Sequence, residues 1–147
     1  MLPAYKVATA IIPISKTNGA TAVGEYIDRL GYDFIGIDVV ASTANVVSNT
    51  LNVLAVAESD DTVVTNFAAV TGMDGGTGFT IATNAYTNTA SQNLWSFRID
   101  GRKRKRYLKV SASPQTTMVI AGIAHLHRGK EAPITASDAN ALNIVEG

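Results

Sequence analysis

Short runs of alternating polar and apolar residues follow one another along almost the whole chain, and this period of two limits the fold more than any other feature. The runs are rich in β-branched and aromatic residues, and loops of Gly, Asn, Asp and Ser separate them. Such a pattern is typical of antiparallel strands with one buried face. Long helical periodicity is absent. The sequence therefore predicts an all-β fold, a single-domain antiparallel β-sandwich of the jelly-roll type with extended terminal arms.

The alternation also predicts which side chains meet in the core, because residues two apart in a strand share a face. We expect the core to contain the apolar faces of three runs: Ile35, Ile37 and Val39; Trp95, Phe97 and Ile99; and Leu108 and Val110. The run from Tyr5 to Ile12 is expected to be an outer strand that stops at Pro13. The run from Met118 to His127 is expected to be the last strand.

Length and composition limit the organisation of the chain. Its 147 residues are enough for one stable domain, which we place at residues 1–130. The polar segment 131–147 is expected to form a C-terminal arm, with a helical turn beginning at Ser137. No cysteine is present, and no window approaches the about 18 apolar residues of a membrane span. The first residues do not resemble a signal peptide, so we expect synthesis in the cytoplasm and no membrane partner.

Charge is uneven along a chain whose formal net charge is zero. Seven of the twelve Lys and Arg residues lie between positions 98 and 109, and five of them are consecutive. These five are Arg102, Lys103, Arg104, Lys105 and Arg106. They precede a strand that is predicted to begin at Tyr107. Arg104 and Arg106 lie an even number of positions before Leu108, so they share the side of the chain that faces the core in this strand. Because both precede the strand, we expect them to lie just beyond the edge of the core.

A basic run of this kind has three ordinary uses. It can bind the phosphates of a nucleic acid, but Tyr107 is the only aromatic residue beside it, and the whole chain is neutral. It can dock on an acidic neighbour in a salt-dependent way. It can also keep a sheet edge solvated and so discourage aggregation. We favour the acidic partner and place nucleic acid last, so the predicted contact residues are Arg102, Lys103, Arg104, Lys105 and Arg106.

No residues at catalytic or metal-binding spacing accompany the basic run. His125 and His127 share a strand face, but zinc needs a further protein ligand that no matching spacing supplies. The glycine-rich segment 72–78 matches no phosphate-binding motif and is expected to be a loop with glycines at positive φ. The acidic residues at 58–61 are expected to form a solvated turn and not a calcium site. We therefore predict no enzyme activity, no cofactor and no metal.

Three stretches together resemble small proteins of tailed bacteriophages and prophages, whose genes often lie near the head genes. They are IDRLGYD at 27–33 with IDV at 37–39, ESDDT at 58–62, and GRKRKRYLK at 101–109 with Pro114 beyond. The likeness covers about residues 20–130 and consists of turns and strands, not catalytic motifs. It implies a virion structural protein, and in particular a capsid decoration (cement) protein on the outside of the phage head.

This resemblance also implies partners and a location. A decoration protein would be made in the host cytoplasm and would lie on the capsid surface of the virion, with the major capsid protein as its partner. It would also contact copies of itself, and a trimer would suit the three-fold positions of an icosahedral shell. The arm after Gly129, together with Met1–Ala4, would lie across adjacent subunits.

Two other classes of protein remain open from the sequence. One is a different phage virion component, such as a neck, tail or head-fibre base protein. The other is a carbohydrate-binding jelly-roll module, which would stack sugars on exposed rings such as Tyr26, Tyr32 or Tyr86. Trp95 has the chemistry of a sugar platform, but its strand parity places it in the core.

Overall fold

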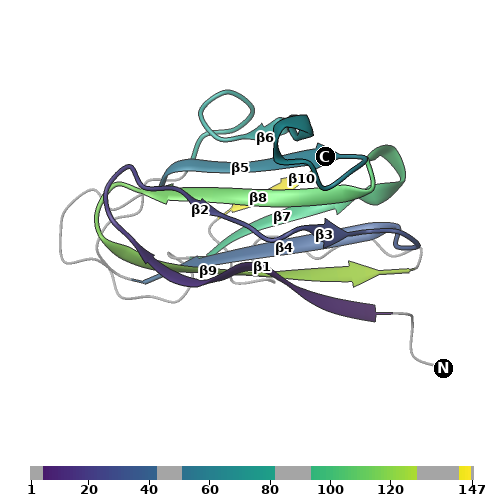
Figure 1. Cartoon of the computed structure of the whole chain (residues 1–147), viewed down its shortest axis with the longest axis horizontal. Coiled ribbons are helices and arrows are strands. Elements are labelled where there is room, and N and C mark those ends of the chain that lie inside the picture. Colours follow the sequence, from purple (N-terminus) through teal and green to yellow (C-terminus); the bar gives the residue numbers. More distant parts are fainter. Residues whose placement is uncertain (1–4, 43–50, 82–93, 129–142, 147) are drawn as a thin grey trace.

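The computed structural model describes residues 5–42, 51–81, 94–128 and 143–146, which form two β-sheets facing each other (Figure 1). The first sheet has the strand order β1 (Tyr5–Lys16), β9 (Met118–His127), β4 (Phe34–Ala41), β7 (Leu94–Asp100) and β10 (Asn143–Glu146). The second has the order β2 (Ala22–Val23), β8 (Tyr107–Pro114), β5 (Leu51–Ser59) and β6 (Ala68–Asp74), and β3 (Ile27–Asp28) also pairs with β8. The short 3₁₀ helices η1 (Val64–Asn66) and η3 (Gly101–Lys103) lie in connections between strands.

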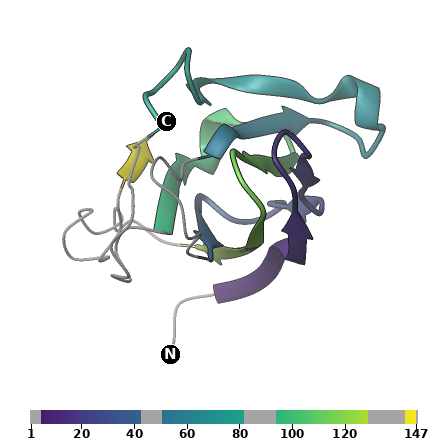
Figure 2. The same ribbon diagram turned by 90° about the vertical axis from the view of Figure 1, so that its left-hand side faces the viewer.

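The predicted all-β sandwich is confirmed. Paired strands run antiparallel, except that β10 runs parallel to β7. Figure 2 looks along the strands and shows the sheets on either side of the core, with β10 at the margin opposite β1. The jelly-roll arrangement is a finer statement and stays a prediction.

The end of the chain differs from the simplest expectation. The strand predicted at Met118–His127 has those bounds as β9, but it is not the last strand, because β10 follows it. Four residues of the segment expected as an arm thus join the first sheet. Residues 131–142, the helical turn predicted at Ser137 and the N-terminal arm at Met1–Ala4 lie outside the described residues.

Alternation along the strands builds the core between the two sheets. The predicted core residues are all buried, namely Ile35, Ile37, Val39, Trp95, Phe97, Ile99, Leu108 and Val110. In β5 the alternation is broken by a register shift between Leu51 and Val53. Such an irregularity turns successive side chains to the same face. Leu51 and Leu54, which simple alternation places on opposite faces, are therefore both buried.

The outer strand β1 is longer than the sequence predicts. Its position at the edge of the first sheet is confirmed, but the strand continues past Pro13 to Lys16. Register shifts between Thr9 and Ile11 and between Ile11 and Ile14 interrupt the ladder with β9 around the proline. An edge strand tolerates proline at such an irregularity, because the missing N–H is not needed for pairing.

A two-residue bridge joins β1 to the second sheet. The backbone N–H of Gly24 donates to the carbonyl of Val110 in β8, at 2.8 Å. The next N–H, of Glu25, donates to the carbonyl of Ala10 in β1, also at 2.8 Å. This segment, which we call the Gly24–Glu25 bridge, therefore covers part of the free edge of β1 and ties the two sheets together.

Candidate functional site

The basic run forms the connection between β7 and β8 and crosses from the first sheet to the second at one end of the sandwich (Figure 1). We call Arg102–Arg106 the basic loop. It begins within η3, and β8 begins at Tyr107 as predicted. The buried Gly101 starts the turn, with its N–H donating to the carbonyl of Asp33 at 2.7 Å. A Cβ at Gly101 would lie 2.5 Å from Cδ1 of Ile35 and 3.1 Å from the backbone oxygens of Asp33 and Tyr32, so glycine suits this close approach.

Arg102 is held by the last residue of β7. Its Nε donates to Oδ1 of Asp100 at 2.9 Å and its Nη2 to Oδ2 at 2.8 Å, a two-pronged contact that matches the shapes of the two groups. Oδ1 of Asp100 also accepts from the backbone N–H of Arg102 at 3.1 Å. These hydrogen bonds lower the pKa of Asp100 to about 2. The guanidinium lies 5.3 Å from the centre of the Phe34 ring.

Arg106 forms the same kind of contact with β3. Its Nε donates to Oδ1 of Asp28 at 3.1 Å, and its Nη2 donates to Oδ2 at 2.8 Å. The side-chain hydrogen bond from Arg106 is the main cause of a lowered pKa of Asp28. The guanidinium also lies 4.9 Å from the centre of the Tyr107 ring. The last arginine of the basic loop is therefore bound to both a carboxylate and an aromatic face.

Arg104 lies deeper, with its side chain 17% exposed. Its Nη1 is 3.8 Å from Oε1 of Glu58, and its Nε has no hydrogen-bond partner among the described residues. The other oxygen of Glu58 accepts from the backbone N–H of Lys105 at 3.0 Å. Arg29 donates from Nε to the carbonyl of Lys105 at 2.6 Å and from Nη2 to that of Arg104. Side-chain and backbone contacts together fix the path of the loop.

The two lysines of the basic loop are placed differently from the three arginines. Lys103 and Lys105 are exposed, and in the described part of the chain neither ammonium group lies within ion-pair distance of a carboxylate. At longer range, Lys103 contributes to the lowered pKa of Asp100, and Lys105 to that of Asp61. The five predicted contact residues are thus divided into three bound arginines and two unbound lysines, a division that the sequence alone does not show.

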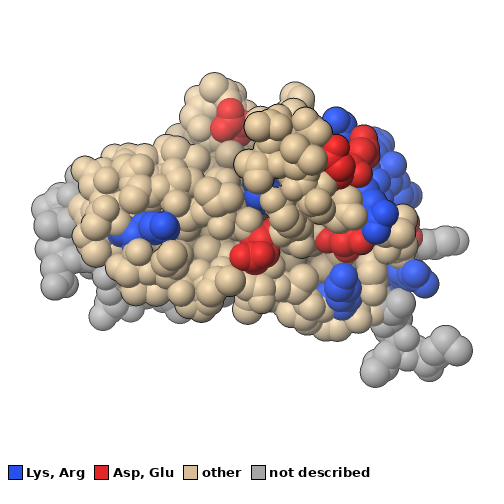
Figure 3. Space-filling model, viewed as in Figure 1, with Lys and Arg blue, Asp and Glu red and all other residues tan. Residues whose placement is uncertain are grey.

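Charged residues gather at the end of the sandwich that carries the basic loop. Figure 3 shows most of the Lys, Arg, Asp and Glu side chains of that face at the right-hand end, while other residues cover most of the remaining described surface. We call the basic loop with Asp28, Arg29, Glu58 and Asp100 the charged end. Its three carboxylates pair with the three arginines of the basic loop, so its unbalanced positive charge lies on the two lysines and on Arg29. Arg29 is half-buried, and its guanidinium donates to backbone carbonyls.

The ion pairs of the charged end predict a loss of stability in acid. Asp100 has an ordinary pKa of 3.8 when unfolded and about 2 when folded. A carboxyl group with a depressed pKa stabilises the folded state above its unfolded pKa, and this contribution is lost as pH falls through the folded pKa. We expect the melting temperature to fall between about pH 4 and pH 2, and to fall less steeply in Asp100→Asn. Thermal melts of both proteins across this range test it; identical pH profiles would contradict the assignment.

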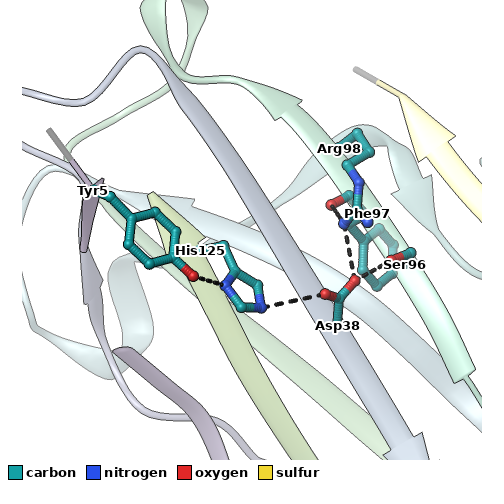
Figure 4. A network of polar contacts seen from close by, with 6 residues as sticks. All are labelled: Tyr5, Asp38, Ser96, Phe97, Arg98 and His125. Carbon is teal, nitrogen blue, oxygen red and sulfur yellow. Dashed lines mark hydrogen bonds and ion pairs between the residues drawn. The ribbon is translucent and has the colours of Figure 1, made fainter. Parts of the chain in front are cut away.

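A second group of polar side chains crosses the outer face of the first sheet (Figure 4). We call Tyr5, His125, Asp38, Ser96 and Arg98 the polar row. The Tyr5 hydroxyl lies 2.6 Å from Nδ1 of His125, and Nε2 of His125 lies 3.4 Å from Oδ2 of Asp38. With the imidazole proton on Nε2, facing the carboxylate, the tyrosine hydroxyl donates to Nδ1. Oδ1 of Asp38 accepts from Nη1 of Arg98 at 2.9 Å and from the Ser96 hydroxyl.

The polar row links four strands and does not form a hydrolase relay. The Ser96 hydroxyl donates to Asp38 and not to the imidazole, so the histidine is not placed to take its proton. Burial lowers the pKa of the neighbouring His127, with repulsion from His125 and Arg98 adding to the effect. The alternation along its strand places Asp38 on the outward face. The polar row also depends on how neighbouring strands are aligned, which alternation within one strand does not show. The polar row was therefore not predicted from the sequence.

The other candidates from the sequence have local roles. The carboxylate of Asp61 accepts from Nδ2 of Asn66 at 2.8 Å and from the N–H of Val63 at 2.9 Å, and these bonds lower its pKa. The segment predicted as a glycine-rich loop at 72–78 is a loop only in part, because β6 continues to Asp74. Gly72 and Gly76 have the expected positive φ, 84° and 92°, whereas Gly75 and Gly78 do not. Within the described residues there is no group of three or more His, Cys, Asp or Glu placed to hold a metal. No helix among the same residues has the length and apolar character to cross a membrane.

The aromatic residues considered as sugar platforms are already in contact with neighbours. Trp95 is 2% exposed, which confirms its predicted place in the core. The Tyr26 ring stacks on Phe67 at 5.6 Å between centres, and Nζ of Lys109 lies over both rings. The guanidinium of Arg128 lies 5.5 Å from the centre of the Tyr32 ring, and Tyr86 is outside the described residues.

No family model matches this sequence, and a search of curated proteins finds no match either. The residues and their geometry are therefore the basis for assigning a function.

Proposed function

We propose that the protein is a non-enzymatic virion structural protein, a capsid decoration protein that binds the outer surface of a phage head through the charged end. One observation carries this proposal. The basic loop is held in a fixed shape by ion pairs at one end of the sandwich, while the rest of the described surface in Figure 3 carries few charges. A fixed, exposed positive feature on a weakly charged body supports docking on an acidic surface, because complementary charge guides association.

The outer face of the first sheet is consistent with a protein that lies among neighbours. Aliphatic side chains there are about half exposed, from 47% to 57%: Val7, Ile12, Val40, Val119 and Ile123. These exposed side chains support contact between this face and neighbouring molecules. On a capsid lattice, each contact is repeated many times, so a modest affinity per copy gives firm attachment when copies also touch one another. The resemblance of the turn and strand segments to small tailed-phage proteins points to the same role.

The proposal is tested by co-sedimentation of the purified protein with heads of its own phage that lack it, at low and at high salt. We expect saturable binding in copy numbers set by the shell lattice, weakened by salt because surface charge contacts are screened. The decoration role would be refuted if the protein did not bind, or if only a few copies bound per particle. A few copies would instead favour a neck, tail or head-fibre base protein.

A further inference from the structure

The basic loop alternates between residues that are bound within the molecule and residues that are not. Arg102 is bound by Asp100, Arg104 by Glu58 and Arg106 by Asp28. Between them, Lys103 and Lys105 are exposed, without a carboxylate at ion-pair distance among the described residues. In the order Arg-Lys-Arg-Lys-Arg, the arginines are therefore held by carboxylates of the same chain, and the lysines are free to contact a partner.

The chemistry of the two residue types fits this division. Arginine presents a planar fork that matches a carboxylate, and the Asp100 and Asp28 contacts use two nitrogens each. Lysine carries a compact, hydrated charge on a flexible stem, which contacts a partner without a fixed geometry. Since each arginine charge faces an acid of its own chain, its field at a distance is small. The field that an approaching partner meets at the basic loop comes mainly from the two exposed lysines, because Arg29, the other cation of the charged end without a carboxylate, is half-buried against backbone carbonyls.

The surroundings of the lysines indicate an acidic protein surface and not a nucleic acid. Asp60 and Asp61 are exposed on the neighbouring turn, and Lys105 is close enough to Asp61 to affect its pKa. A nucleic-acid backbone is a continuous line of negative charge, which these carboxylates would repel. The Tyr107 ring, which would otherwise stack on a base, has the Arg106 guanidinium over its face. Two separate positive points beside negative ones match discrete Asp and Glu side chains better than a row of phosphates.

We infer that Lys103 and Lys105 make the contact with the partner, that the partner presents clustered Asp and Glu side chains, and that the three arginines hold the loop in shape. This inference rests on the proposed function for the identity of the partner as a capsid shell. Two side chains of the basic loop, and not all five, are then the docking residues. Substitution of the lysines is expected to weaken binding, whereas substitution of the arginines is expected to disturb the fold of the loop.

The central experiment compares wild type with Lys103→Gln/Lys105→Gln in co-sedimentation with phage heads across a salt series. Two lost contacts are expected to weaken binding about tenfold at low salt and to flatten its salt dependence. Lys16→Glu is the matched control, because it changes the net charge by the same two units at the end of β1, away from the basic loop. It is expected to bind like wild type. Equal binding by the double-lysine variant would overturn the inference and leave the decoration role intact.

A second measurement separates this inference from the proposed function. Wild type and the double-lysine variant are titrated with a short peptide whose Asp and Glu residues are clustered between Gly and Ser residues, and with double-stranded DNA, at low salt. Lysine-dependent binding to the acidic peptide supports the inference even if wild type does not bind heads. Stronger binding to DNA than to the acidic peptide, or no binding of wild type to the acidic peptide, would overturn it. The melting temperature of the double-lysine variant should match wild type, because neither lysine forms an ion pair in the described structure.

Discussion

Replacing Phe97 with alanine is expected to lower the free energy of unfolding by about 3–5 kcal/mol, the usual cost of removing a buried aromatic side chain. Phe97 is 0% exposed in β7, between β4 and β10 in the first sheet. Its ring contacts that of Phe79 edge to face, with the ring centres 5.8 Å apart. Loss of the ring would remove this contact and leave a cavity that fixed strands on both sides cannot close.

Equilibrium unfolding in urea measures this effect, with Val64→Ala as the control. Val64 is 62% exposed in η1, so its truncation should change the free energy of unfolding by no more than about 0.5 kcal/mol. A cost below about 1 kcal/mol for Phe97→Ala would mean that the two sheets do not pack as described.

Gly24→Ala is expected to destabilise the protein by about 1–3 kcal/mol or more, as overpacking does at a site that cannot relax. A Cβ at Gly24 would lie closer than 3.0 Å to the backbone carbonyl oxygens of both Ala10 and Val110. The same two oxygens accept the hydrogen bonds of the Gly24–Glu25 bridge. Because backbone atoms cannot rotate away as a side chain can, the added methyl group must push the bridge out of place.

Two readouts separate this effect from a general loss of stability. The free energy of unfolding should fall in Gly24→Ala and hardly change in Val23→Ala, whose side chain is 60% exposed. Hydrogen exchange of the Gly24 and Glu25 amides should also become faster under native conditions. Unchanged exchange at both amides would show that the Gly24–Glu25 bridge tolerates a side chain at position 24.

The sequence predicts the core well, because burial of one face leaves a visible period of two. Ile37 and Phe97 are examples whose place in the core follows from their strand alone. The register shift in β5 breaks that period, so simple alternation assigns some of its side chains to the wrong face. In β1 the strand continues through Pro13, so the sequence predicts its end too early. The pairing of β10 with β7 joins distant segments through a four-residue strand, which is too short to show a pattern.

The candidate site is predictable only in part, for a related physical reason. The concentration of positive charge at 102–106 and the start of β8 at Tyr107 can be read directly from the sequence. The carboxylate partners of Arg104 and Arg106 cannot be read from it, because Glu58 and Asp28 come from strands far away in the chain. Which cations remain free therefore depends on tertiary structure. The same applies to the polar row, where strand register brings Asp38 and His125 together.

The pairing of β1 with β9 has a consequence for the kinetics of folding. Tyr5 and His125, which contact each other across these strands, are 120 positions apart in the chain. A large loop must close before such a pair forms, and domains built from distant strand pairs fold over about milliseconds to seconds, more slowly than helical bundles. Before β1 pairs with β9, one side of β9 is an unpaired strand edge that can pair with other chains. Rapid dilution at low protein concentration should therefore give a better refolding yield than refolding at high concentration.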